Sequence, residues 1–155
     1  MTAIAVAAPP CEERVATTRF GTVAYREEAV LDFPKGLPGF AANRRFLFAR
    51  VPRVSGPFHL LHGLDGDAVD LLVAPLDGLD AGVAAADVDA ARRALAIPTG
   101  DLLVLCVVTL PARGSGGAPR VNLRAPILVD VARRTAAQVV LANPGYPFRE
   151  PLRAA

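Results

Sequence analysis

Nine short runs of apolar and β-branched residues, most of them separated by glycine, proline, aspartate or asparagine, constrain the fold of this chain. Runs of this length and composition predict β-strands, and the close spacing leaves little room for helical crossovers. The predicted strands are residues 19–25, 29–33, 45–50, 58–63, 68–74, 102–110, 120–124, 126–131 and 137–142. Many short strands with few helices favour an antiparallel barrel or sandwich over a doubly wound parallel sheet.

One segment, residues 87–96, has the spacing of a helix. Asp87 is suited to cap its start, and Pro98 follows its end. We therefore predict a mainly β fold, a small antiparallel β-barrel (pseudo-barrel) with one short helix. We expect residues 1–17 to form a disordered N-terminal tail and residues 18–152 to form a single domain.

The chain is 52% hydrophobic, but no apolar run reaches the roughly 18 residues that a membrane span needs. Its first ten residues, MTAIAVAAPP, have no basic residue before the apolar stretch, unlike a secretory signal. We therefore expect a soluble cytoplasmic protein. The two cysteines, Cys11 in the tail and Cys106 in an apolar run, do not suggest a disulfide framework or a metal site.

Residues suited to catalysis are sparse. His59 and His62 are the only histidines, and a spacing of three on a strand sends them to opposite faces. Asp65 and Asp67 could form a carboxylate pair, but GLDGDA is also typical of a hairpin turn. We predict no catalytic, cofactor-binding or metal-binding residue and do not expect an enzyme. Two alternatives stay open: a small enzyme with a site at the barrel mouth, and a small β-barrel that binds RNA.

Charge is distributed unevenly along the chain. Residues 64–101 contain eight aspartates and two arginines, a net charge of −6, whereas the whole chain carries +2. An acidic segment can attract a basic partner and repel nucleic acid. Asp65, Asp67 and Asp70 are therefore candidates for a partner-binding surface; the alternative is that they are solvated loop residues.

The stretch DFPKGLPGF, residues 32–40, contains two prolines and two glycines between apolar residues. Its second Pro-Gly pair suits the centre of a type II turn, and another bend is expected before it. Two successive bends fix the directions of Phe33, Leu37 and Phe40. These side chains either close one end of the barrel or present a preformed contact surface.

A second unusual stretch is VNLRAPILVDV, residues 121–131. Pro126 cannot donate to a strand ladder, so it marks an edge or a break between two strand halves. Asn122 either satisfies backbone groups left open at this break or belongs to an edge on which another chain docks. Ile127 would contact such a chain if its side chain points outward.

Five stretches, in this order and at this spacing, resemble the FliW family of flagellar assembly factors over about residues 18–152: RFGTVAY, LDFPKGLPGF, PFHLLHG, VNLRAPILVDV and QVVL. The resemblance implies a non-catalytic β-barrel-like protein without a cofactor. It also implies binding to the translational regulator CsrA, which relieves repression of flagellin mRNA, and binding to flagellin, which displaces CsrA. We expect a monomer that contacts neither nucleic acid nor a membrane directly.

The residues expected at the partner surface combine the acidic segment with the two unusual stretches and one aromatic residue. They are Leu37, Phe40, Phe58, Asp65, Asp67, Asp70, Asn122, Pro126 and Ile127. The aspartates are expected to attract CsrA, and the apolar edge is expected to bind flagellin.

Overall fold

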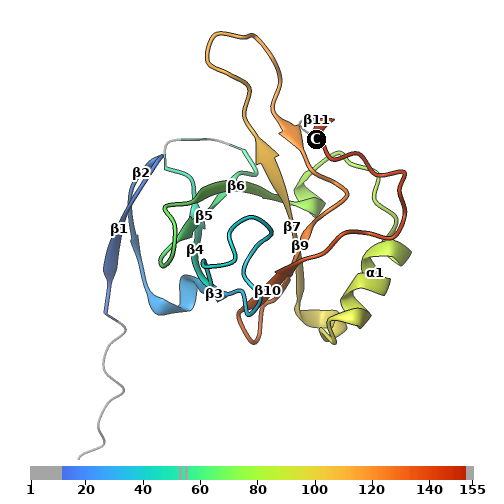
Figure 1. Ribbon diagram of the computed structural model, residues 1–155, viewed down its shortest axis with the longest axis horizontal. Coiled ribbons are helices and arrows are strands. Elements are labelled where there is room, and N and C mark those ends of the chain that lie inside the picture. The colour runs from blue at the N-terminus through green and yellow to red at the C-terminus, as the bar shows by residue number, and fades with distance from the viewer. Residues whose placement is uncertain (1–11, 53, 55, 153–155) are drawn as a thin grey trace, which may run out of the picture.

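The structure, a computed structural model, describes residues 12–52, 54 and 56–152 (Figure 1). Its strands are β1 (Arg14–Thr18), β2 (Gly21–Tyr25), β3 (Val30–Asp32), β4 (Arg45–Arg50), β5 (His59–Gly63), β6 (Asp70–Pro75), β7 (Leu102–Thr109), β8 (Arg120–Val121), β9 (Ile127–Asp130), β10 (Thr135–Gln138) and β11 (Glu150–Pro151). Its helical elements are α1 (Ala85–Ala94) and the short 3₁₀ turns η1 (Glu27–Ala29), η2 (Leu76–Gly78) and η3 (Thr99–Asp101). None of the helices within this described part is long and apolar enough to cross a membrane.

Seven strands close into a barrel, in the order β7, β6, β5, β4, β3, β10, β9 and back to β7. All neighbours in this ring are antiparallel except β3 and β10, which pair in parallel at Asp32 and Thr135. The prediction of a mainly antiparallel barrel with one α-helix is confirmed. Closure leaves the ring without a free edge along most of its circumference.

Two apolar layers lie on the two sides of the barrel wall. The interior receives a side chain from each ring strand, including Phe46, Leu61 and Leu105. The second layer lies outside β5, β6 and β7, where the segment around α1 and the C-terminal segment cover it. Alternate residues of β7 enter each layer, so Leu105 points inward and Cys106 points outward. This explains why the run LLVLCVV contains no polar position.

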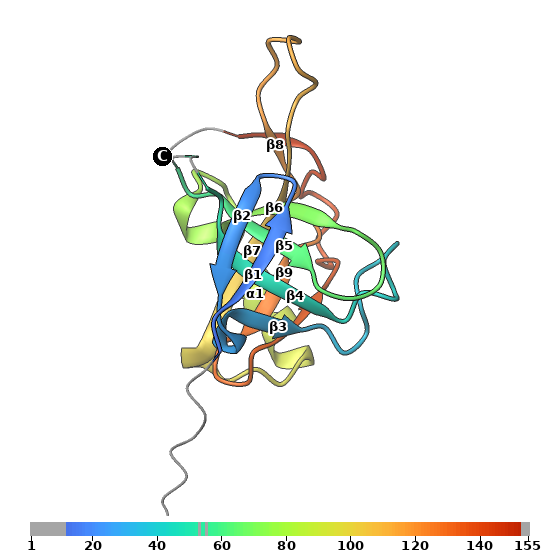
Figure 2. The same cartoon turned by 90° about the vertical axis from the view of Figure 1, so that its left-hand side faces the viewer.

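A two-stranded hairpin, β1 and β2, lies against the barrel beside β4 (Figure 2). Its ladder pairs Arg14 with Tyr25 and ends at a turn where the Thr18 hydroxyl donates to the Gly21 carbonyl over 2.7 Å. The prediction of a disordered tail through residue 17 is therefore wrong for β1, which is ordered by its pairing with β2. Residues 1–11 of the predicted tail lie outside the described residues.

The helix begins two residues before its predicted start, at Ala85. Asp87 lies inside the first turn and does not cap it. Instead, the Tyr146 hydroxyl donates to the Asp87 carboxylate and accepts a hydrogen bond from the Ala84 amide, 2.9 Å away. A tertiary contact from the C-terminal segment thus replaces the predicted local cap.

Candidate functional site

The bends in residues 32–40 form as predicted. The amide of Phe40 donates to the Leu37 carbonyl and that of Gly36 to the Phe33 carbonyl, each over 2.8 Å, and Gly39 has φ +84°. Leu37, however, is only 3% exposed and belongs to the barrel interior, against which Phe40 packs half-buried. The bend therefore closes one end of the barrel, and the prediction of Leu37 as a surface contact is wrong.

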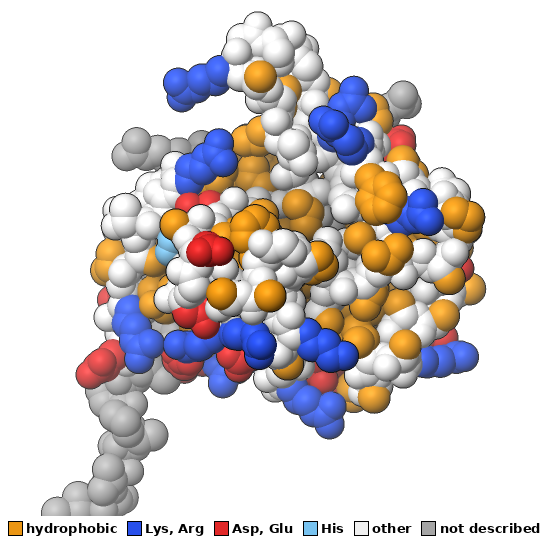
Figure 3. Space-filling view, viewed as in Figure 1, with side chains coloured by type: hydrophobic (Ala, Val, Ile, Leu, Met, Phe, Trp, Pro, Cys, Tyr) orange, Lys and Arg blue, Asp and Glu red, His pale blue; other side chains and the backbone are white. Residues whose placement is uncertain are grey.

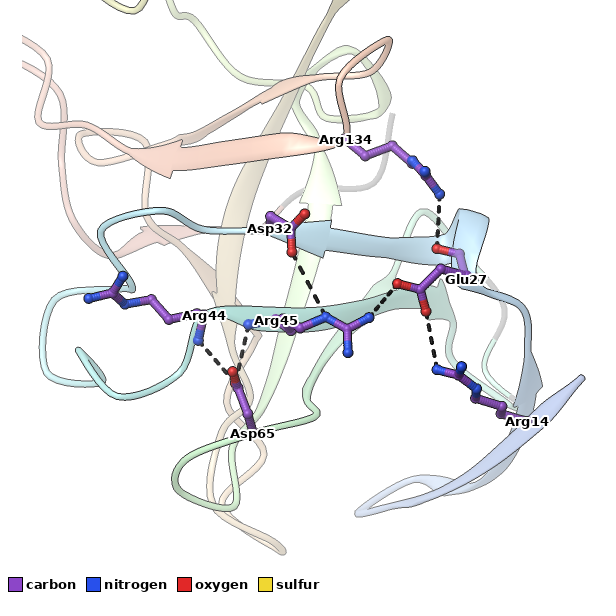
Figure 4. Close-up of polar contacts among 7 residues, drawn as sticks. All are labelled: Arg14, Glu27, Asp32, Arg44, Arg45, Asp65 and Arg134. Atoms are coloured by element: carbon purple, nitrogen blue, oxygen red, sulfur yellow. Dashed lines mark hydrogen bonds and ion pairs between the residues drawn. The ribbon is translucent and has the colours of Figure 1, made fainter. Parts of the chain in front are cut away.

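A buried amide, which the sequence analysis did not single out, links this bend to the β5–β6 turn. The Asn43 side chain donates to the backbone carbonyls of Asp65 and Asp67 and accepts from the Asp67 amide. The Asp65 carboxylate in turn accepts from the backbone amides of Arg44 (3.0 Å) and Arg45 (3.1 Å), as Figure 4 shows. Asp65 therefore links two loops, and its carboxylate is already occupied by hydrogen bonds within the protein.

Asp70 is also engaged. One carboxylate oxygen lies 2.6 Å from Nδ1 of His62, and the other accepts a hydrogen bond from the Arg19 amide over 2.9 Å. Asp70 thus joins the β1–β2 turn to the barrel wall. Of the three aspartates predicted at a partner surface, only Asp67 is exposed with its carboxylate free of ion pairs and hydrogen bonds to the described residues.

The two histidines lie on opposite faces of β5, as predicted. His59 shares the inward face with Leu61 and stacks on the ring of Phe48 at a centroid distance of 4.9 Å, whereas His62 points outward to Asp70. No group of three or more potential metal ligands occurs in the described part of the chain. The two rings therefore do not form the barrel-mouth site that the enzyme alternative requires.

The stretch around Pro126 is a break inside the fold, and the prediction of a docking edge there is wrong. Asn122 Oδ1 accepts hydrogen bonds from the backbone amides of Arg124 (3.1 Å) and Ala125 (3.0 Å). The Asn122 side chain therefore satisfies backbone groups beside the break. Pro126 is buried, and Ile127 is fully buried in the interior with strand partners on both sides. Phe58, the remaining candidate, is half-buried against the outer apolar layer.

Acidic and basic side chains mix at the lower end of the molecule in the view of Figure 3. The Glu27 carboxylate contacts Arg14 at 3.2 Å and also contacts Arg45, while Arg134 donates to the Glu27 carbonyl (Figure 4). Exposed pairs of this kind contribute little to stability. The pairs neutralise the charges of Arg14 and Arg45, whereas the bond from Arg134 to a backbone carbonyl leaves its charge uncompensated.

An apolar cleft of about 410 Å³ lies between α1 and the outer face of β7. Its wall includes Leu76, Val83, Val88, Leu102 and Val104. Apolar side chains also gather on the surface in the right half of Figure 3, the side on which Figure 1 places α1. Sequence patterns do not reveal this cleft, because it depends on how α1 packs against the outer face of β7 in the folded chain.

Hydrogen bonds hold α1 over the cleft at both ends. The bond from Tyr146 to Asp87 holds the first turn and raises the pKa of the Tyr146 hydroxyl. Near the last turn, the Arg92 guanidinium donates to Asp89 and to the Ile97 carbonyl, 2.8 Å away. The contact with Arg92 lowers the pKa of the Asp89 carboxyl.

The architecture defines a small closed β-barrel protein with an external apolar layer and a helix-covered cleft. A protein-family model described as "FliW protein" matches residues 14–152. The chain therefore belongs to the FliW family.

Flagellar assembly factors FliW from several bacteria are similar to this chain over most of its length. The factor of Clostridium beijerinckii is 28% identical over 133 residues, covering 85% of this chain and 92% of that protein. The factor of Thermotoga maritima is 30% identical (85% and 88% covered), and that of Geotalea uraniireducens 32% (89% and 83%). A crystal structure of the flagellar assembly factor FliW has the same fold, with a TM-score of 0.67, 21% identity and coverage of 89% of this chain and 96% of that one.

Proposed function

We propose that this protein is a cytoplasmic, non-catalytic flagellar assembly factor that binds CsrA and flagellin in turn. The observation that carries the proposal is the match to the FliW family over residues 14–152. In this proposal, binding to CsrA relieves repression of flagellin mRNA, and free flagellin displaces CsrA. The protein acts as a monomer and does not contact RNA itself.

The free carboxylates give this proposal an electrostatic basis. Asp67, Asp77, Asp80 and Asp101 make no side-chain hydrogen bond or ion pair with the described residues. An RNA-binding regulator must be basic to hold phosphates, so these charges would attract it and repel the RNA. Because long-range attraction is screened by salt, association with CsrA is expected to slow as salt rises.

A gel-shift experiment with the leader of flagellin mRNA tests the proposal at physiological salt. The protein alone should leave the RNA unshifted, and it should abolish the shift that CsrA produces. Adding purified flagellin should restore that shift. A shift by the protein alone would favour the RNA-binding alternative, and an undiminished CsrA shift would refute antagonism.

A further inference from the structure

The helix over the cleft is incompletely buried. None of the residues in α1 is fully buried, and Val88, which faces the cleft, is half-exposed. A ten-residue helix is marginal alone and depends on packing of its apolar side. Here that packing leaves an apolar hollow of about 410 Å³, within the usual range for ligand sites. A ligand with apolar side chains would therefore bury surface that the free protein exposes.

The floor of the cleft is β7, whose ladder with β6 stops before β7 does; the η2 turn lies next to this end of β7 without forming a ladder with it. β6 ends at Pro75, opposite Leu105, whereas β7 extends back to Leu102. Leu102, Leu103 and Val104 pair with β9 on one side and have no ladder partner on the other among the described strands. Such an edge can accept an added extended segment through its backbone groups. The cleft thus offers both apolar pockets and a strand edge.

The cleft is flanked by uncompensated negative charge. Asp77 lines it, and Asp80 and Asp101 lie next to its wall segments in the chain. These three carboxylates make no side-chain hydrogen bond or ion pair with the described residues, whereas Asp89 is paired with Arg92. A bound segment that carries lysine or arginine beside its apolar residues would complement this charge.

We propose that the cleft between α1 and β7 is a docking site for an extended segment of a protein partner. This segment carries apolar side chains next to lysine or arginine. The inference rests on the proposed function, because it assumes that the protein acts by binding other proteins. It adds where a partner docks and which kind of segment the site binds.

Val88→Trp fills the cleft with an apolar side chain, so it should block the site while the barrel stays folded. Ala90→Trp is the matched control because Ala90 is exposed on the same helix and does not line the cleft. The charge is tested by the triple variant Asp77→Asn, Asp80→Asn, Asp101→Asn. Its control removes three exposed charges elsewhere: Glu12→Gln, Glu13→Gln and Glu28→Gln.

The probe is a phage-displayed library of random 12-residue peptides, selected on the full chain, so the test does not require a known partner. Enriched peptides should combine apolar and basic residues. Their affinity, measured by fluorescence anisotropy, should fall at least about tenfold with Val88→Trp and with the aspartate triple variant. Both control variants should stay within about twofold of the wild type.

Failure to enrich peptides, an acidic consensus, or equal binding by Val88→Trp would overturn the docking site. Sedimentation measures whether the cleft joins two copies of this chain. A wild type that is dimeric and a Val88→Trp variant that is monomeric would show that a second copy occupies the cleft, and this result would also overturn the proposed docking site. Purified CsrA and flagellin then separate this inference from the proposed function. If they bind wild type and Val88→Trp equally, only the docking site fails; if neither binds the wild type, it is the proposed function that fails.

Discussion

The hydroxyl of Tyr146 donates a hydrogen bond to the carboxylate of Asp87, across 59 residues of sequence. The same oxygen accepts the amide of Ala84, so one side chain of the C-terminal segment holds the start of α1. The helix that covers the proposed docking cleft is therefore positioned by a residue far from it in the chain.

This contact predicts how the protein responds to alkali. The hydrogen bond to Asp87 raises the pKa of Tyr146 in the folded state, so its stabilising effect is complete below the unfolded pKa of about 10. The effect should be lost as pH rises through the higher folded pKa. Urea unfolding between pH 8 and 11 should show this loss in the wild type and a smaller dependence in Tyr146→Phe. Identical pH profiles would contradict the prediction.

Replacing Gly36 with alanine should destabilise the bend that closes the barrel. Gly36 has φ +65°, and a Cβ there would lie 2.8 Å from the backbone oxygen of Ala41. The left-handed conformation alone costs about 1–2 kcal/mol for a residue with a side chain, and the clash adds to this. Gly82→Ala is the control because no atom lies within 4 Å of its Cβ position. Equal unfolding free energies for the two variants would refute this explanation.

Asn43→Ala should lower the free energy of unfolding by about 1–3 kcal/mol for each buried backbone group left without a partner. The side chain is fully buried and bonds to the backbone of both Asp65 and Asp67. Chemical denaturation measures the change. Asn143→Ala removes an amide from an exposed loop and should cost much less; a comparable loss in this control would show that Asn43 has no special role.

Cys106 should resist alkylation in the folded protein. Burial in the outer apolar layer raises the pKa of its thiol to about 12, so almost no thiolate forms at pH 8. In a Cys11→Ser variant, which leaves Cys106 as the only thiol, iodoacetamide labelling followed by mass spectrometry should be slow until urea unfolds the chain. Fast labelling of the native variant would show that the outer layer opens readily.

Much of the fold could be predicted from sequence because the relevant signals are local. The strand β4 has its predicted bounds, residues 45–50, and both bends in residues 32–40 form where proline and glycine favour them. The spacing of the histidines correctly placed them on opposite faces of β5. β1 was missed because a five-residue strand is ordered here by pairing with β2, which no local pattern reveals.

The candidate surface was predicted less well, because burial depends on which distant segments meet. Ile127 and Leu37 are apolar residues next to prolines, a pattern that fits a surface contact as well as a buried position. Only closure of the ring placed them in the interior. Likewise, Asp65, Asp67 and Asp70 are equivalent in a charge count, yet backbone amides and a histidine engage two of them and leave the third free.

The sequence by itself determined most of the strands, the turns and the family, because backbone preference and residue order are properties of neighbouring positions. Only the tertiary structure decided which faces are buried and where the cleft lies. The reason is that β7 pairs with β6 and β9, which are far from it in the chain, and the point where the ladder with β6 stops sets the open edge.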